Sequence, residues 1–132
     1  MAKARKVKEI SFTMSDKVGL LSEVTTAVAK AKVNITAICA YAMENSATFM
    51  LTTDSNTKAK KALAPLSVTI EEADVVEVEV PNKSGELQKV AKKIADGGID
   101  IQYMYATAGK GKTATCIFKT AGDSKTIKVI NK

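Results

Sequence analysis

The histidine and cysteine content of the chain excludes several familiar kinds of catalysis. The sequence of 132 residues has no histidine and two cysteines, Cys39 and Cys116. A Ser-His-Asp triad, a histidine base and a histidine metal site are therefore excluded, and two distant cysteines cannot complete a zinc site in one chain. Both cysteines lie in apolar runs, which favours buried thiols over a disulfide. We predict no enzymatic activity, no catalytic residues, no metal and no cofactor.

Two other groups of residues resemble reactive motifs but have simpler explanations. The segment Gly111-Lys112-Thr113 matches the last three residues of the phosphate-binding loop motif. The full motif needs a glycine where this chain has Ala106, and a helix after it, so local composition favours a hairpin turn. The acidic residues between Glu71 and Glu79 favour a solvated linker and strand face over a buried catalytic carboxylate pair.

The positive charge of the chain raises nucleic acid as a partner. The net charge is +6 and the pI is about 9.3, yet Arg5 is the only arginine. Arginine is the residue best suited to bidentate phosphate and base contacts, and the lysines here are scattered. The chain has tyrosines on its predicted second strands: Tyr41, Tyr103 and Tyr105. Sheet proteins that bind RNA stack bases on aromatic residues of their first and third strands, so packing of these tyrosines in the core is favoured. An RNA-binding sheet protein remains the least favoured alternative.

The elements that position these residues occur twice in the chain. When the sequence is shifted by 66 residues, Asp16-Lys17-Val18-Gly19 aligns with Asn82-Lys83-Ser84-Gly85. Asn34-Ile35 aligns with Asp100-Ile101 in the same register. After one inserted residue, Thr48-Phe49-Met50-Leu51 aligns with Thr115-Cys116-Ile117-Phe118. Repetition at a fixed spacing indicates two copies of one structural unit.

Hydrophobic periodicity assigns the same elements to each copy. Apolar residues alternate in the first segment of each copy and then recur at helical spacing. The predicted elements of the first copy are a strand at 9–14, a helix at 20–31, strands at 35–43 and 48–53, a helix at 54–65 and a strand at 68–70. Those of the second copy are a strand at 76–80, a helix at 87–95, strands at 99–107 and 113–119, and a helix from 123. No residues remain for a closing strand in the second copy, so we expect that something else covers this sheet edge.

Local signals at the helix ends differ between the two copies. Gly97-Gly98 is a clear helix stop, whereas the first copy has Lys32 at this place. A left-handed Lys32 would cost about 1 kcal/mol through steric strain, so we expect this helix to end differently. Asp54 or Ser55 is expected to begin the second helix, and Asp123 or Ser124 to cap the last one.

The element order predicts the fold class. Two βαββαβ modules, the second lacking its last strand, indicate an α+β protein with ferredoxin-like modules. We expect their antiparallel sheets to pair side by side with the helices on one face, because a module of this size has a marginal core. The predicted domains are residues 1–72 and 73–132. No apolar stretch approaches the length of a membrane helix or a signal peptide, so a cytoplasmic protein is expected.

The repeated motif resembles the ACT domain family over residues 7–132. Ser15-Asp16-Lys17-Val18-Gly19-Leu20-Leu21 followed by Val33-Asn34-Ile35 is similar to its pattern N-R-P-G-x-L … G-V-N-I. The second copy has Asn82-Lys83-Ser84-Gly85-Glu86-Leu87 and Gly98-Ile99-Asp100-Ile101. The family's proline is Val18 and Ser84 here, and its arginine is Lys17 and Lys83. The resemblance implies a stand-alone regulatory protein that senses amino acids, with ligand between the glycine loop of one module and the second strand of the other.

The resemblance also implies the ligand-binding residues. Backbone N–H groups at a helix N-terminus bind a carboxylate, and glycine permits close approach. The implied residues are Asp16, Lys17, Val18, Gly19, Leu20, Asn34, Ile35, Asn82, Lys83, Ser84, Gly85, Glu86, Leu87, Asp100 and Ile101. If each loop faces the other module, Asn82 meets Asn34, and Asp16 meets Asp100. The two carboxylates would repel, so we predict that the Asn82/Asn34 site is the stronger amino-acid site.

The expected partners follow from this resemblance. They are a small-molecule ligand, with an amino acid favoured, an enzyme subunit, and a second copy of the chain in a homodimer. A membrane is not expected. The main alternative is a structural interaction module that pairs with an enzyme subunit and binds no small molecule.

Overall fold

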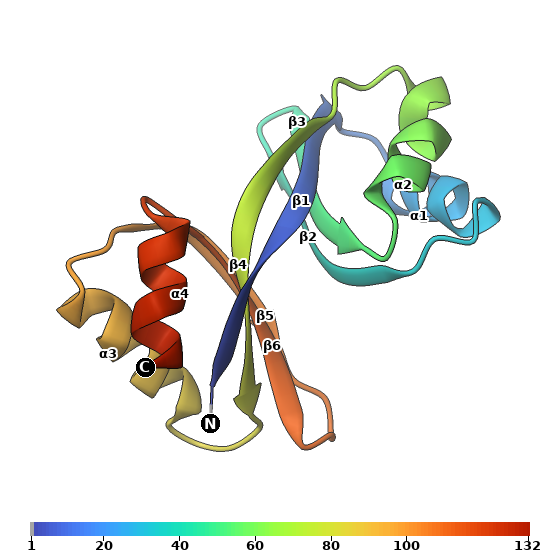
Figure 1. The fold of residues 1–132 in the computed structure, drawn as a ribbon. Coiled ribbons are helices and arrows are strands. Elements are labelled where there is room, and N and C mark those ends of the chain that lie inside the picture. Colours follow the sequence, from blue (N-terminus) through green and yellow to red (C-terminus); the bar gives the residue numbers. More distant parts are fainter. Residues whose placement is uncertain (1) are drawn as a thin grey trace. The chain divides into compact units, whose positions relative to one another are not determined.

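The computed structural model describes residues 2–132, which form six strands, four α-helices and one short 3-10 helix (Figure 1). In chain order the elements are β1 (Lys3–Ser15), α1 (Leu20–Lys30), β2 (Ile35–Met43), β3 (Ser46–Thr53), α2 (Asn56–Leu63), η1 (Ala64–Leu66), β4 (Glu71–Pro81), α3 (Glu86–Asp96), β5 (Ile101–Thr107), β6 (Thr113–Thr120) and α4 (Asp123–Asn131). None of the helices in the described residues is long and apolar enough to cross a membrane.

The chain forms two compact units, each built around one copy of the repeat. We call Lys8–Ala73 the first-repeat unit, and Asp74–Lys132 together with residues 2–7 the second-repeat unit. The predicted domains, 1–72 and 73–132, differ from these units at the N-terminus. Residues 2–7 precede the first copy in sequence, yet they belong to the unit of the second copy.

The start of β1 occupies the place of the strand that the second copy lacks. Ala4 is buried in one cluster with Val76 and Ile130, and the Arg5 side chain lies 2.6 Å from Glu77. The side chain of Asn131 accepts a hydrogen bond from the Ala4 N–H at 2.7 Å and donates one to the Ala4 carbonyl at 2.9 Å. The sheet edge that the sequence left uncovered is therefore covered by the N-terminal segment.

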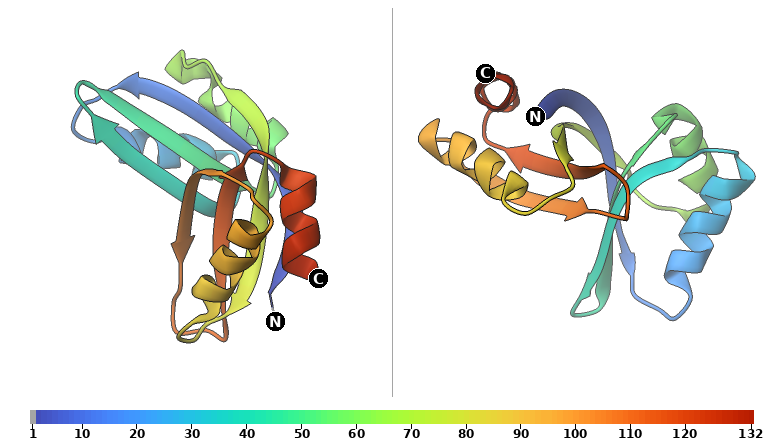
Figure 2. Two further views of the ribbon diagram at one scale, coloured as in Figure 1. Left: turned by 90° about the vertical axis from the view of Figure 1, so that its left-hand side faces the viewer. Right: turned by 90° about the horizontal axis from the view of Figure 1, so that it is seen from below.

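Both units consequently have the same strand arrangement. The first-repeat unit has the order β2-β3-β1-β4, in which β4 contributes its first residues. The second-repeat unit has the order β1-β4-β6-β5, in which β1 contributes residues 3–7. In each unit two helices cover one face of the strands (Figures 1 and 2). This confirms the predicted α+β class and the ferredoxin-like βαββαβ modules.

The core of the first-repeat unit lies between its strands and helices. Ile10 and Phe12 of β1 and Phe49 and Leu51 of β3 are buried against α1 and α2. Phe12 and Phe49 are direct partners across the two strands, and their rings stack with centroids 5.2 Å apart. Because alternate residues of a strand point to one face, the period of two in the sequence produces this apolar layer.

The second-repeat unit has a core of the same design with smaller side chains. Val76, Val78 and Val80 of β4 are buried with Cys116 and Phe118 of β6. The remaining members come from the two helices and from the N-terminal segment: Val90, Ile94, Ile130 and Ala4. The aromatic pair of the first-repeat unit is thus replaced by Val78 and Cys116, which are direct partners in the strand register.

A polar cluster joins the second helix of the first-repeat unit to its fourth strand. The Asn56 amide donates to the Lys8 carbonyl and to the Glu72 carboxylate, at 3.1 and 3.0 Å. Lys60 lies 2.8 Å from the same carboxylate. The hydrogen bond from Lys60, followed by that from Asn56, lowers the pKa of Glu72 from its ordinary value.

Equivalent hydrogen bonds connect equivalent residues in the two copies. The turn before the first helix is held by Asp16 N–H to the Asn45 carbonyl in one copy, and by Asn82 N–H to the Lys112 carbonyl in the other. The chain after that helix is held by Val33 N–H to Val28 and by Ile99 N–H to Ile94. The two copies therefore share backbone hydrogen bonds as well as a sequence pattern.

Tyr41, expected in the core, is 48% exposed, and three expectations about helix ends and strand bounds were also wrong. Lys32 adopts the left-handed conformation with φ 58°, as Gly98 does with φ 67°, so the two helices end alike despite the strain. The residue that precedes α4 is Gly122, with no side-chain cap, and Asp123 is already helical. Residues 68–70 are not a strand, because the 3-10 turn at 64–66 and left-handed Ser67 delay β4 until Glu71.

Candidate functional site

The glycine loop of the second-repeat unit exposes the start of α3. Gly85 has φ 88°, a left-handed conformation that favours glycine, and a Cβ there would meet nothing within 4 Å. The helix opens with a hydrogen bond from the Lys89 N–H to the Gly85 carbonyl at 3.1 Å. The N–H groups of a first turn have no partners within the helix and carry the positive end of its dipole. The loop therefore presents donors suited to an anion.

Asn82 joins this loop to the hairpin between β5 and β6. Its side-chain amide donates to the carbonyls of Gly109 and Gly111 at 2.8 and 3.0 Å, and its N–H donates to that of Lys112 at 2.8 Å. The segment Gly111-Lys112-Thr113, which resembles the end of a phosphate loop, thus belongs to a hairpin, as predicted, and carbonyls of this hairpin hold Asn82. Asn82 positions the glycine loop.

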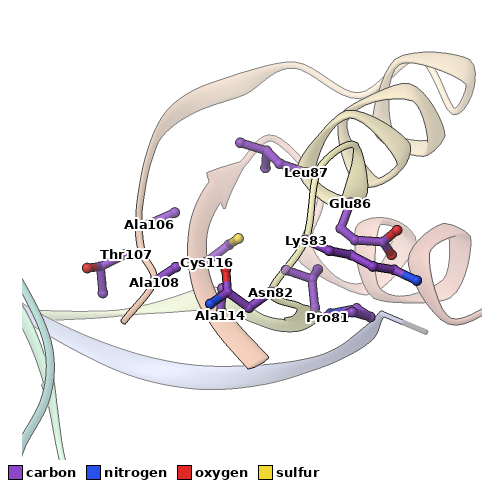
Figure 3. Close-up of a pocket in the computed structure, with 11 residues that line it drawn as sticks. Pro81, Asn82, Lys83, Glu86, Leu87, Ala106, Thr107, Ala108, Ala114 and Cys116 are labelled. Atoms are coloured by element: carbon purple, nitrogen blue, oxygen red, sulfur yellow. The ribbon is translucent and has the colours of Figure 1, made fainter. Parts of the chain in front are cut away.

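A pocket of about 240 Å³ lies between the loop, α3 and the two strands of this hairpin (Figure 3). Its lining residues are Val80, Pro81, Asn82, Lys83, Glu86, Leu87, Ala106, Thr107, Ala108, Ala114 and Cys116. Small apolar side chains from the hairpin face Leu87 across the pocket, and Leu87 is 45% exposed. The pocket combines an apolar interior with a helix N-terminus at its rim.

The charged ends of two lining residues are directed away from this interior. Figure 3 shows the Lys83 ammonium and the Glu86 carboxylate on the far side of the loop from Ala106. The Glu86 carboxylate lies 2.9 Å from the Lys89 ammonium, and this hydrogen bond lowers the pKa of Glu86 from its ordinary value. Neither charge competes with a ligand carboxylate for the helix N-terminus inside the pocket.

Cys116 forms the floor of the pocket. Its side chain is 2% exposed, and burial raises the pKa of its thiol above the ordinary value. The thiol therefore stays neutral at physiological pH and acts as a small apolar group. The floor carries no charge.

The glycine loop of the first-repeat unit has the same backbone but different surroundings. Gly19 has φ 88° and precedes α1, and the Glu23 N–H donates to its carbonyl at 3.0 Å. Lys17 lies 3.0 Å from the Glu23 carboxylate, and Val18 is fully exposed. Asp16 is held through its backbone N–H, as Asn82 is in the other copy.

The residues at the start of each second strand are held within their own units. Asn34 donates its N–H to the Asp54 side chain and accepts from the Asp54 N–H, both at 3.0 Å. Asp100 accepts at its carbonyl from the Ala121 N–H at 3.1 Å. The pairs predicted to bind ligand, Asn82 with Asn34 and Asp16 with Asp100, take one residue from each unit and stay a prediction.

The sequence prediction missed much of the pocket. Asn82, Lys83, Glu86 and Leu87 were predicted site residues. The hairpin side chains that complete the pocket were not: Ala106, Thr107, Ala108, Ala114 and Cys116. The alignment of Cys116 with Phe49 was the available signal, because it marks a position where a large side chain becomes small.

Comparison with known proteins identifies the family of the chain. Residues 8–63 match the ACT domain family. Among solved structures, protein BT0572 from Bacteroides thetaiotaomicron is 30% identical, with a TM-score of 0.87 over 97% of this chain and 88% of that one. No curated protein matches the chain. The chain belongs to the ACT domain family, and this membership supports a regulatory role through small-molecule binding.

More distant solved structures share the fold. The regulatory subunit of aspartate kinase from Thermus thermophilus has a TM-score of 0.67 and 14% identity over 97% of this chain and 94% of that one. A structure of aspartokinase alpha and beta subunits has a TM-score of 0.68 and 16% identity over 98% of this chain and 95% of that one. At these identities the likeness concerns the arrangement of the elements.

Proposed function

We propose that this protein is a non-catalytic regulator that binds a free amino acid in the pocket of the second-repeat unit. The observation that carries the proposal is the pocket itself, which places an apolar interior beside the exposed start of α3. A free amino acid has a carboxylate for the helix N-terminus and a side chain for the interior.

The carboxylate is proposed to bind the N–H groups of Leu87 and Gln88, because the Glu86 N–H already donates to the Lys83 carbonyl at 3.4 Å. An anion at this place gains from the helix dipole and from donors with no partner in the helix. The left-handed Gly85 leaves open space before these groups, since a Cβ there would contact nothing. Asn82, held by the hairpin carbonyls, keeps the loop in this conformation.

The size of the pocket supports a ligand as small as one amino acid. Pockets for drug-sized ligands measure roughly 300–1,000 Å³. The volume here is about 240 Å³, which is below that range and suits a small ligand. Among small metabolites, an amino acid matches the combination of one anionic group with an adjacent apolar surface.

Regulation is proposed to act through an enzyme partner. One solved structure with this fold is described as the regulatory subunit of aspartate kinase. A ligand shifts an equilibrium only by its differential affinity for the two states. We propose that the occupied pocket changes the affinity of this chain for an enzyme subunit, and that the same linkage makes the enzyme change the affinity for the amino acid.

A thermal-shift screen of the twenty amino acids tests the proposal. A ligand at 100 times its dissociation constant should stabilise the folded chain by about 2.7 kcal/mol. Asn82→Ala is expected to weaken the effect, because the loop loses its attachment to the hairpin. Asp16→Ala changes the equivalent residue of the other copy and should leave binding unchanged. If no amino acid raises the melting temperature, the chain is a structural interaction module instead; loss of binding in the Asp16 variant alone would place the ligand elsewhere.

A further inference from the structure

The cores of the two copies differ at one pair of facing strand residues. In the first-repeat unit this pair is Phe12 and Phe49, which stack with their ring centroids 5.2 Å apart. In the second-repeat unit the pair is Val78 and Cys116. Two aromatic rings are therefore replaced by an isopropyl group and a thiol.

The strand registers show that Cys116 and Phe49 are structurally equivalent. Phe49 faces Ala40 across β2 and β3, and Cys116 faces Ala106 across β5 and β6. The sequence repeat aligns the same residues. Cys116, the equivalent of Phe49, lines the pocket of the second-repeat unit. The pocket thus lies beside a position where the second copy has the smaller side chain.

The pocket interior is lined by apolar side chains around Cys116. Ala106, Ala114 and Cys116 line it from the hairpin, and Leu87 lines it from α3 (Figure 3). Val80 of β4 also lines the pocket. The charged ends of Lys83 and Glu86 lie outside this interior. A buried charge without a partner is strongly disfavoured, so a charged ligand side chain would find no compensation here.

We propose that the pocket selects amino acids with short, uncharged aliphatic side chains, and that Cys116 sets the permitted length. This inference rests on the proposed function. The side chain of the ligand takes the place that the Phe49 ring has in the other copy, while its carboxylate remains at the start of α3. The first-repeat unit, filled by Phe49, holds no such ligand.

Calorimetry on the full chain with glycine, alanine, 2-aminobutyrate, valine, leucine, aspartate and lysine tests the selectivity. Affinity should rise roughly fourfold with each methylene or methyl group that the pocket buries, and then fall once the pocket is full. Aspartate and lysine should bind at least tenfold more weakly than the best aliphatic ligand. Tighter binding of a charged amino acid would overturn the inference and leave the proposed function standing.

Variants at Cys116 test its role in setting the length. Cys116→Val narrows the pocket and should move the preferred ligand to a shorter side chain, whereas Cys116→Ala should move it to a longer one. Cys116→Phe, which restores the residue type of the other copy, should abolish binding. Phe49→Leu is the matched control and should leave the order of affinities unchanged. Circular dichroism establishes that each variant is folded.

The outcomes separate the inference from the function on which it rests. An unchanged order of affinities in folded Cys116→Val and Cys116→Ala overturns the inference, because the ligand would then lie away from this floor. Altered preference in Phe49→Leu would also overturn it. If none of the amino acids binds the unmodified chain, the proposed function itself fails.

Discussion

A single residue shows how a local conformation is kept at an energetic cost. Lys32 and Gly98 occupy equivalent positions after the first helix of each copy, and both are left-handed. In both copies the residue donates its N–H to the carbonyl three positions earlier, Ala29 or Ala95, at 2.9 Å. The first copy therefore holds a lysine in a backbone conformation that glycine adopts more easily.

Lys32→Gly is expected to stabilise the protein. Relief of the steric strain should raise the free energy of unfolding by about 0.5–1 kcal/mol, since Lys32 is exposed and loses few contacts. Gly98→Lys, the reciprocal change, should lower it by a similar amount. Urea unfolding followed by circular dichroism measures both. A destabilised Lys32→Gly variant would show that the lysine side chain contributes more than the strain costs.

At the scale of elements, the last helix holds the first strand in place. Asn131 is the final residue of α4, and its amide binds both the N–H and the carbonyl of Ala4. One side chain thus satisfies two backbone groups of the same residue, which fixes where the N-terminal segment lies in the second-repeat unit. These two bonds add to the register that burial of Ala4 and the pairing of β1 with β4 already specify.

Asn131→Ala is expected to loosen the N-terminal segment without unfolding the protein. Loss of two hydrogen bonds should cost about 1–3 kcal/mol. Hydrogen exchange should accelerate at residues 3–7 more than in β6 of the same unit. Lys128→Ala, an exposed change in the same helix, serves as the control. Equal exchange rates in the variant and the unmodified protein at 3–7 would contradict the assigned role.

At the scale of the whole molecule, two strands are divided between the two compact units. The boundary between the units falls inside β1, after Val7, and inside β4, after Ala73. Each of these long strands therefore contributes to both units. The second-repeat unit therefore contains residues from both ends of the chain.

Deletion of residues 1–7 is expected to destabilise the second-repeat unit selectively. The unit would lose Ala4 from its core and expose a row of unpaired backbone groups on β4. Amide protection in β6 should fall by a larger factor than in β3, as measured by hydrogen exchange under native conditions. Replacement of Lys3, Arg5 and Lys6 by alanine in the full chain is a control for the three lost charges. Equal protection in β3 and β6 after deletion would show that the segment is dispensable.

The candidate site was predictable only in part. Gly85, Asn82 and Leu87 follow from a glycine loop before a periodic helix, which is a local pattern. The binding partners of the Asn82 amide, Gly109 and Gly111, come from the hairpin and could not be inferred from that pattern. The pocket itself depends on which strand faces the loop.

The sequence by itself determined the repeat, the element types and the two glycine loops. These features depend on periodicity and turn chemistry within short segments, where the residues that decide them are close in the chain. The tertiary structure alone decided that residues 3–7 complete the second-repeat unit, because the contact between Ala4 and Asn131 joins residues 127 positions apart. It also decided that a pocket lies beside Cys116, the equivalent of Phe49, since an unfilled volume depends on every side chain around it.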